Sequence, residues 1–198
     1  MCIGTMFSDE LAFQNLSSPI THPTTMIPTG TRIGHVHLKV ANLDRALNFY
    51  CKILGFEITQ RMGNSAAFIS AGGYHHHIGL NTWESLNAPA PPPHSTGLYH
   101  LAIVYPTRAD LARALETLIE NKIQLDGASD HGVSEALYLR DPDQNGVELY
   151  WDRPQSAWPR TPAGDLAMFS RHLDLHNLLA EANQPAPAPD LPEGPRDL

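Results

Sequence analysis

The sequence predicts an α+β fold built from two βαβββ halves. The first observation is a short alternating strand that is followed by an amphipathic helix and three strand-like runs. The second is the return of the same order after a proline-rich linker. The two predicted helices even share a fragment, LDRAL at 43–47 and LARAL at 111–115. An element order that recurs within one chain indicates an internal repeat.

The first half is expected over residues 32–86. Its opening run, IGHVHLKV (33–40), alternates as a strand does, which places His35 and His37 on one face. ANLDRALNFYCKILGF then has apolar residues at three- and four-residue steps, with Asn42 as a candidate N-cap and Gly55 as the stop. The runs FEITQRM, SAAFISAG and HHHIGLNTW predict three strands.

The second half, residues 97–153, repeats this order after the linker 87–96, whose prolines exclude a regular element. YHLAIVY predicts a strand and RADLARALETLIENK a helix. Strands follow in IQLDGA, SEALYLRD and GVELYWD, and DPDQNG between the last two predicts a hairpin turn.

Both ends of the chain are predicted to lie outside this repeat. Residues 1–31 contain proline and threonine clusters without a sustained period and are expected to form an irregular arm. Residues 154–184 are expected to form a C-terminal extension with one helix within GDLAMFSRHLDLHNLLAEA. The proline-rich residues 185–198 are expected to be disordered.

Composition excludes several functional classes. The chain has 198 residues, of which 42% are hydrophobic, and its formal charge of −8 disfavours nucleic acid as a partner. No apolar run approaches the ~20 residues that span a bilayer, so no membrane partner is expected. The N-terminus lacks the pattern of a secretory signal, and two cysteines form no disulfide framework. A cytoplasmic protein is therefore expected.

Three of the predicted strands each carry one potential metal ligand: His35, His100 and Glu148. Two imidazoles and one carboxylate can occupy one face of a divalent metal and leave its other positions free for substrate and dioxygen. Glu148 stands between Val147 and Leu149, and an inward-facing carboxylate on an apolar strand needs a partner. The spacing of these residues does not by itself predict that they converge.

The runs HVHLKVANLDRALNFYCKILGF, GLYHLAIVY and LYLRDPDQNGVELYWDRP resemble the vicinal oxygen chelate superfamily over residues 32–153. That group includes glyoxalase I, extradiol dioxygenases, fosfomycin resistance enzymes and bleomycin-binding proteins. The resemblance implies that the paired modules form a cup-shaped mixed sheet around a metal. Its ligands come from the first strand of each half and the last strand of the second, which implies His35, His100 and Glu148.

The fourth strand separates the branches of this superfamily. Glyoxalase I has a Glu or Gln at about the position of His77 or Ile78, whereas this chain has no carboxylate or amide there before Asn81. The chain looks most similar to the catechol-dioxygenase-like subgroup, in which a histidine of that strand is catalytic.

That resemblance implies His76 or His77 as the catalytic histidine of strand four, and His131 and Tyr138 as the catalytic pair of the second half. Tyr138 precedes Glu148 by ten residues, as in the catechol-cleaving pattern. His131 stands closer to the tyrosine than its counterpart does in the best-known members. The implied roles are a base, either Tyr138 or His131, and a hydrogen-bond donor to dioxygen, either His76 or His77.

The expected function is an Fe(II)-dependent, extradiol-type ring-cleaving dioxygenase of aromatic compound catabolism, acting on a small catechol-like diol and dioxygen. One alternative is a lyase or transferase of the glyoxalase or fosfomycin type that uses Mn, Ni, Mg or Zn. Another is a non-enzymatic small-molecule-binding member of the superfamily. Because the chain has one complete module where many catechol dioxygenases have two, a homodimer is also expected.

Overall fold

The computed structural model describes residues 26–183. The chain divides into two units, Met1–Ile33 and Gly34–Leu198. Of the first unit, residues 26–33 form a turn and neither helix nor strand, and the rest of the expected arm lies outside the described residues. The expected disordered tail, 185–198, lies outside them as well. Among residues 26–183 no helix is both long and apolar enough to cross a membrane.

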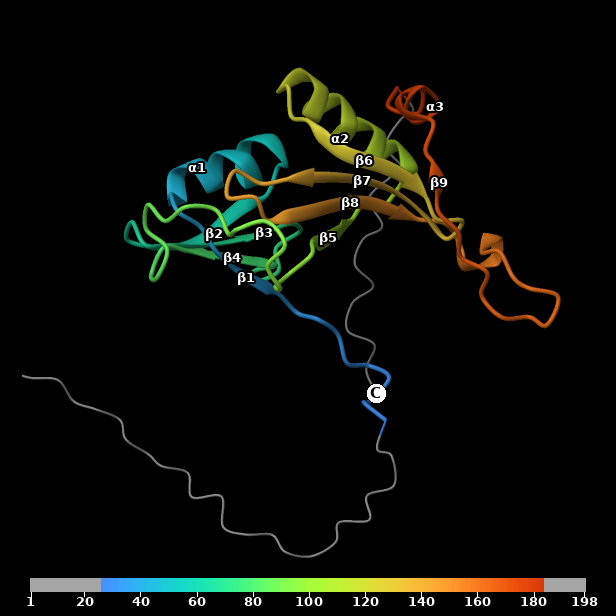
Figure 1. Ribbon diagram of the computed structural model, residues 1–198, viewed down its shortest axis with the longest axis horizontal. Coiled ribbons are helices and arrows are strands. Elements are labelled where there is room, and N and C mark those ends of the chain that lie inside the picture. Colours follow the sequence, from blue (N-terminus) through green and yellow to red (C-terminus); the bar gives the residue numbers. More distant parts are fainter. Residues whose placement is uncertain (1–25, 184–198) are drawn as a thin grey trace, which may run out of the picture. The chain divides into compact units, whose positions relative to one another are not determined.

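The second unit has the predicted βαβββ order twice, followed by an extension (Figure 1). The first half comprises β1 Val36–Lys39, α1 Leu43–Leu47, the π-helical turn η1 Asn48–Ile53, β2 Glu57–Met62, β3 Ala66–Ser70 and β4 Ile78–Asn81. The second comprises β5 Leu101–Val104, α2 Arg108–Glu120, β6 Leu125–Asp130, β7 Ser134–Arg140 and β8 Gly146–Asp152. The extension contains the 3₁₀ turn η2 Gln155–Ala157, β9 Arg171–His172 and α3 Leu175–Leu179.

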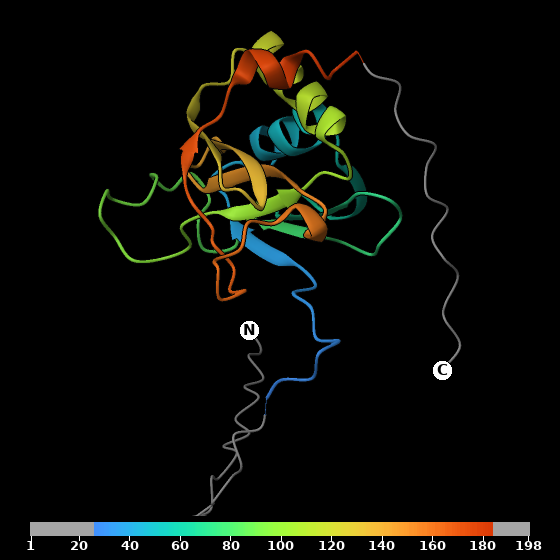
Figure 2. The same ribbon diagram turned by 90° about the vertical axis from the view of Figure 1, so that its right-hand side faces the viewer.

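Each half forms one mixed sheet with the same pairing scheme. The strand orders are β1-β4-β3-β2 and β5-β8-β7-β6-β9, and the first strand of each half pairs in parallel with its last. Helices α1 and α2 lie on the same side of the strands in both views (Figures 1 and 2). The predicted α+β architecture with its internal repeat is confirmed.

Capping and burial explain why the helices form where they do. The side chain of Asn42 accepts from the backbone N–H of Arg45, and that of Thr107 accepts from the N–H of Asp110. The apolar stripe of each helix then packs on one face of its sheet, away from water. The core includes Leu43, Leu47 and Tyr50 against Leu38, Ile69 and Leu80, and Leu111, Leu115 and Leu118 near Leu137 and Leu149.

The predicted turn between β7 and β8 also joins the two halves. Within the turn, Asp141 accepts from the backbone N–H groups of Asp143 and Asn145. The hydroxyl of Tyr50, in the first half, donates to Asp141 Oδ2 at 3.0 Å. Arg45 and the backbone N–H of residue 41 donate to Asp143 Oδ1 at 2.6 and 2.9 Å.

The C-terminal extension contains a helix within the predicted run, together with a strand that the sequence did not predict. The helix α3 covers only Leu175–Leu179, and residues 171–172 form the strand β9 beside β6 instead. Asp174 ends the extended segment because its side chain caps the start of α3. Leu173 and Leu178 of the extension are buried in the core.

Candidate active site and metal ligands

Three site residues predicted for the second half meet on its sheet. Tyr138 on β7 lies directly opposite Glu148 on β8, and Ala102 on β5 lies opposite Glu148 from the other side. His100 immediately precedes β5, so its side chain reaches the same carboxylate. A Cβ at Gly146 would clash with the backbone oxygen of Tyr99. The glycine therefore allows the start of β5 to approach β8 closely.

The side chains form one continuous hydrogen-bonded chain. His100 Nε2 lies 2.8 Å from Glu148 Oε2, and the Tyr138 hydroxyl lies 3.2 Å from Glu148 Oε1, within hydrogen-bond distance. His131 Nε2 lies 2.7 Å from the same hydroxyl. The far end of the chain is His131 Nδ1, which lies 3.2 Å from the backbone oxygen of Phe169.

This chain is partly shielded from water. The side chain of Glu148 is 12% exposed and that of His100 is 30% exposed. Burial, the charge of Glu148 and the hydrogen bond to Glu148, in that order of size, together raise the pKa of Tyr138 to about 12. His100 Nδ1 is buried without a hydrogen-bond partner among the described residues. The site thus holds an imidazole nitrogen and a carboxylate side by side, which are donors that divalent transition metals accept.

The predicted residues of the first half form a second cluster on their own sheet. The rings of His35 and His76 have centroids 4.4 Å apart, and Phe68 lies 5.0 Å from His76. Desolvation lowers the pKa of His76, and the neighbouring His35 and His75 lower it further. His77 lies apart from this contact, because its Nδ1 is 3.0 Å from Ser70 Oγ. Of the two candidates on strand four, His76 is therefore the one in ring contact with His35.

His37 occupies the same face as this cluster. Its ring lies over Gly79, where a Cβ would come within 2.9 Å of the imidazole, and it contacts Trp83 at 5.5 Å. Desolvation lowers the pKa of His37, with His35 as the second cause. The first sheet therefore contributes several histidines, held against aromatic rings.

The two clusters are separate in this structure. His100 and Glu148 are in contact, whereas the contacts of His35 are with the first sheet. Within residues 26–183 no group of three His, Cys, Asp or Glu side chains is arranged to hold a metal ion. The common site of His35, His100 and Glu148 stays a prediction.

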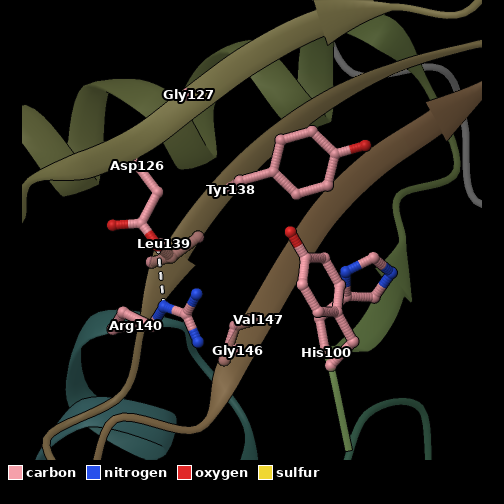
Figure 3. Close-up of a pocket in the computed structure, with 9 residues that line it drawn as sticks. His100, Asp126, Gly127, Tyr138, Leu139, Arg140, Gly146 and Val147 are labelled. Carbon is pink, nitrogen blue, oxygen red and sulfur yellow. Dashed lines mark hydrogen bonds and ion pairs between the residues drawn. The ribbon is translucent and has the colours of Figure 1, made fainter. Parts of the chain in front are cut away.

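A pocket of about 180 Å³ lies beside the second cluster (Figure 3). Its walls include His100 and Tyr138, together with the ion pair of Arg140 and Asp126, whose Nε and Oδ2 atoms are 2.7 Å apart. A larger cavity of about 560 Å³ lies between β1 and the linker, and its lining includes His37 and Asp143. The smaller pocket is the one that contacts the hydrogen-bonded chain.

Sequence reasoning missed Tyr99, Asp126, Arg140 and Phe169. Arg140 follows Tyr138 by two positions on a strand, so alternation places it on the same face and was the available signal. Phe169 contributes a backbone oxygen, which no side-chain pattern reveals.

Comparison with known proteins covers most of this unit. The model of the Glyoxalase/Bleomycin resistance protein/Dioxygenase superfamily matches residues 32–149. Catechol-2,3-dioxygenase of Bacillus subtilis (strain 168) is 42% identical over 159 residues, which are 80% of this chain and 54% of that protein. Biphenyl-2,3-diol 1,2-dioxygenase 2 of Rhodococcus globerulus is 30% identical over 125 residues, 61% of this chain and 63% of that protein. The chain thus matches about half to under two thirds of the length of these relatives.

Solved structures agree at the level of the fold. A glyoxalase/dioxygenase from Nostoc punctiforme matches with a TM-score of 0.54 at 22% identity, covering 68% of this chain and all of the other. Lactoylglutathione lyase from Agrobacterium tumefaciens matches with a TM-score of 0.50 at 21% identity, covering 63% of this chain and 96% of the other. Through its repeated βαβββ modules and the match over residues 32–149, the chain belongs to the Glyoxalase/Bleomycin resistance protein/Dioxygenase superfamily.

Proposed function

We propose that this chain is an extradiol-type ring-cleaving dioxygenase that acts on a small catechol-like diol with Fe(II) and dioxygen. The observation that carries the proposal is the hydrogen-bonded chain from His100 through Glu148 and Tyr138 to His131. It joins two metal donors to a tyrosine and a histidine suited to proton transfer. The names of the curated relatives, which are dioxygenases of catechol and biphenyl-diol, support the same reaction class.

The proposed metal ligands are His35, His100 and Glu148. Fe(II), when bound, would supply an open coordination face at which a diol and dioxygen can react. The donor chemistry fits, because His100 and Glu148 are already adjacent and a neutral imidazole and a carboxylate suit iron. His35 must join this pair from the first sheet. The expected homodimer is part of the proposal, and His35 of a second copy is one source of the third ligand.

In the proposed mechanism Tyr138 and His131 take the phenolic proton of the substrate. The substrate O–H donates to the oxygen of Tyr138, and the Tyr138 proton moves to His131 Nε2, which is 2.7 Å away. The product of this transfer is an imidazolium, and the oxygen of Phe169 stabilises its Nδ1–H. The pocket beside Tyr138, at about 180 Å³, is smaller than the roughly 300 Å³ or more of a drug-sized ligand site and suits a single ring.

His76 is the proposed hydrogen-bond donor to dioxygen as negative charge develops on it. It is preferred to His77 because it contacts His35, one of the proposed ligands. On the same strand Ile78 is buried, and Asn81 Oδ1 accepts from the backbone N–H of Trp83. A glyoxalase-type fourth ligand is therefore not proposed at this strand.

The test is reconstitution of the chain with Fe(II) without oxygen, followed by addition of catechol and dioxygen. A yellow ring-fission product, with oxygen uptake and about one iron per chain, is expected. Bound metal without oxygen uptake across several diols would favour the lyase or transferase class instead. Absence of stoichiometric metal would favour a binding protein without turnover.

Ligand variants make this test specific. We expect His35→Ala, His100→Ala and Glu148→Ala to lose bound iron and activity together. His94→Ala, which removes an exposed linker histidine, is the matched control and keeps both. Retention of iron by Glu148→Ala would overturn the proposed ligand set.

A further inference from the structure

Phe169, in the C-terminal extension, contacts His131 through both of its backbone polar groups. Its N–H donates to the backbone oxygen of His131 at 3.2 Å. Its own backbone oxygen lies 3.2 Å from His131 Nδ1. The residue therefore holds the backbone and the imidazole of His131 at the same time.

We propose that the backbone oxygen of Phe169 is the positioning group that makes His131 a proton acceptor toward Tyr138. A carbonyl oxygen can only accept a hydrogen bond, so His131 Nδ1 must carry the proton. In the neutral ring Nε2 then has a lone pair, and this nitrogen is the one 2.7 Å from the Tyr138 hydroxyl. With the opposite tautomer, Nε2 would be a donor and could not take the Tyr138 proton.

The hydroxyl of Tyr138 has one proton and two acceptors. Oε1 of Glu148 lies 3.2 Å away and Nε2 of His131 lies 2.7 Å away, so the shorter contact favours His131 once its Nε2 is unprotonated. After transfer, both N–H groups of His131 have partners, Phe169 on one side and Tyr138 on the other. The Phe169 carbonyl oxygen can therefore accept a hydrogen bond from Nδ1–H in both the neutral imidazole and the imidazolium.

The turn that follows His131 is packed closely against the side chains of Phe169 and Pro159. Gly132 has φ +80°, and a Cβ there would lie 2.6 Å from Phe169 Cε1 and 2.9 Å from Pro159 Cγ. The phenyl ring fills the space above the turn and is itself covered by the guanidinium of Arg171, 4.3 Å from the ring centroid. Loss of the ring is therefore expected to release the carbonyl as well.

Contacts with the second half anchor the rest of the extension. The strand β9 pairs with β6, and Leu173 and Leu178 are buried in the core. Arg108, on α2, donates to Asn177 and forms an ion pair with Glu181. Phe169 lies beyond residue 149, where the superfamily match ends, so the positioning group belongs to a segment outside that match.

The first test is the tautomer of His131 in the metal-free full-length chain, which is measured by ¹⁵N NMR at alkaline pH, where an imidazole is neutral. We expect the two ring nitrogens to show one fixed tautomer with the proton on Nδ1. A proton on Nε2, or a freely exchanging mixture, overturns the proposal. This measurement needs no substrate, so its outcome is independent of whether the chain cleaves catechols.

The second test compares Phe169→Ala with Phe169→Leu, which retains bulk above Gly132. In the alanine variant we expect His131 to show a mixture of tautomers and kcat to fall by about 10- to 100-fold at unchanged KM and iron content. We expect the leucine variant to recover most of both properties. The kcat measurement in this second test rests on the proposed function, whereas the tautomer measurement does not.

Leu178→Ala distinguishes a loss of His131 positioning from a general loss of stability. It removes a fully buried side chain of the extension that is distant in sequence from His131. This control is expected to lower the melting temperature and leave the tautomer unchanged. If Phe169→Ala does not fold, Arg171→Ala uncovers the ring while keeping Phe169 in place, and partial tautomer exchange is expected there. The proposal would be contradicted if Phe169→Ala, or Arg171→Ala in its place, folded and kept the wild-type tautomer and kcat.

Discussion

At the scale of single residues, Glu148 is the side chain of the second half that contacts both His100 and Tyr138. One carboxylate oxygen contacts His100 and the other lies 3.2 Å from the Tyr138 hydroxyl, so a single side chain links the proposed metal ligands to the proposed proton pathway. Its low exposure matters because hydrogen bonds to a charged group are stronger when water is excluded. Among residues 26–183, His100 Nδ1 has no hydrogen-bond partner, so the polar groups beside Glu148 are incompletely satisfied within this part of the chain.

Tyr138→Phe tests the bridge between Glu148 and His131. Removal of the hydroxyl would interrupt the proposed proton path and leave the proposed ligands His100 and Glu148 in place, so kcat is expected to fall by about 100-fold or more while iron content is unchanged. Steady-state kinetics and metal analysis measure the two quantities. Tyr105→Phe, which alters a half-buried tyrosine outside the hydrogen-bonded chain of His100, Glu148, Tyr138 and His131, is the control. Equal kcat values in the two variants would exclude a proton role for Tyr138.

At the scale of elements, the turn between β6 and β7 links the sheet to the extension. Asp130 begins it, accepting from the N–H of Gly132 and forming an ion pair with Arg153 at 2.6 Å. Burial alone would raise the pKa of Asp130, but the hydrogen bonds from Arg153 and Gly132 and the charges of Arg153 and Arg171 outweigh it, and the pKa is lowered. The folded state therefore favours the ionised carboxylate.

The pH dependence of stability follows from this shift. A carboxylate with a lowered folded-state pKa contributes stability above its ordinary pKa of 3.8 and loses it as the pH falls through the lowered value. We expect the free energy of unfolding to fall less steeply on acidification in Asp130→Asn than in the wild type. Urea denaturation over a pH series measures it, with the exposed Asp165→Asn as control. If the free energy of unfolding fell equally with acidification in the wild type and both variants, the role of Asp130 would be refuted.

At the scale of the whole second unit, the β7–β8 turn joins the two halves by polar contacts. Tyr50 is fully buried in the first half, and its hydroxyl bonds to Asp141 of the second, which is itself 1% exposed. Burial raises the pKa of both side chains. A buried carboxylate depends on its hydrogen bonds, so this contact specifies how the halves meet.

Tyr50→Phe removes one of these bonds while preserving the ring. Because Asp141 keeps its bonds from Asn145, the expected loss is about 1–3 kcal/mol in the free energy of unfolding. Chemical denaturation measures this loss, and Tyr105→Phe again serves as the comparison. A variant as stable as the control would show that the contact between the halves contributes nothing.

The sequence by itself determined the local features. Apolar alternation and helical periodicity predicted the repeated βαβββ order, and turn residues predicted the β7–β8 hairpin, because these patterns depend on near neighbours in the chain. The resemblance of the second half to catechol-cleaving enzymes also selected Glu148, Tyr138 and His131. The structure brings these three together, since Tyr138 and Glu148 are direct partners in the sheet register.

Tertiary structure decided what depends on contacts between distant segments. Alternation could not choose between His76 and His77, because β4 begins only at Ile78 and the preceding residues are not a strand. The extension had a helical period, yet pairing with β6 holds residues 171–172 as a strand, since the hydrogen bonds of a sheet edge compete with intrinsic propensity. Whether His35 reaches His100 and Glu148 depends on the placement of two sheets, and the tautomer of His131 on a backbone oxygen 38 residues away in the chain. No local pattern encodes either relation, because each is set by how separate elements pack.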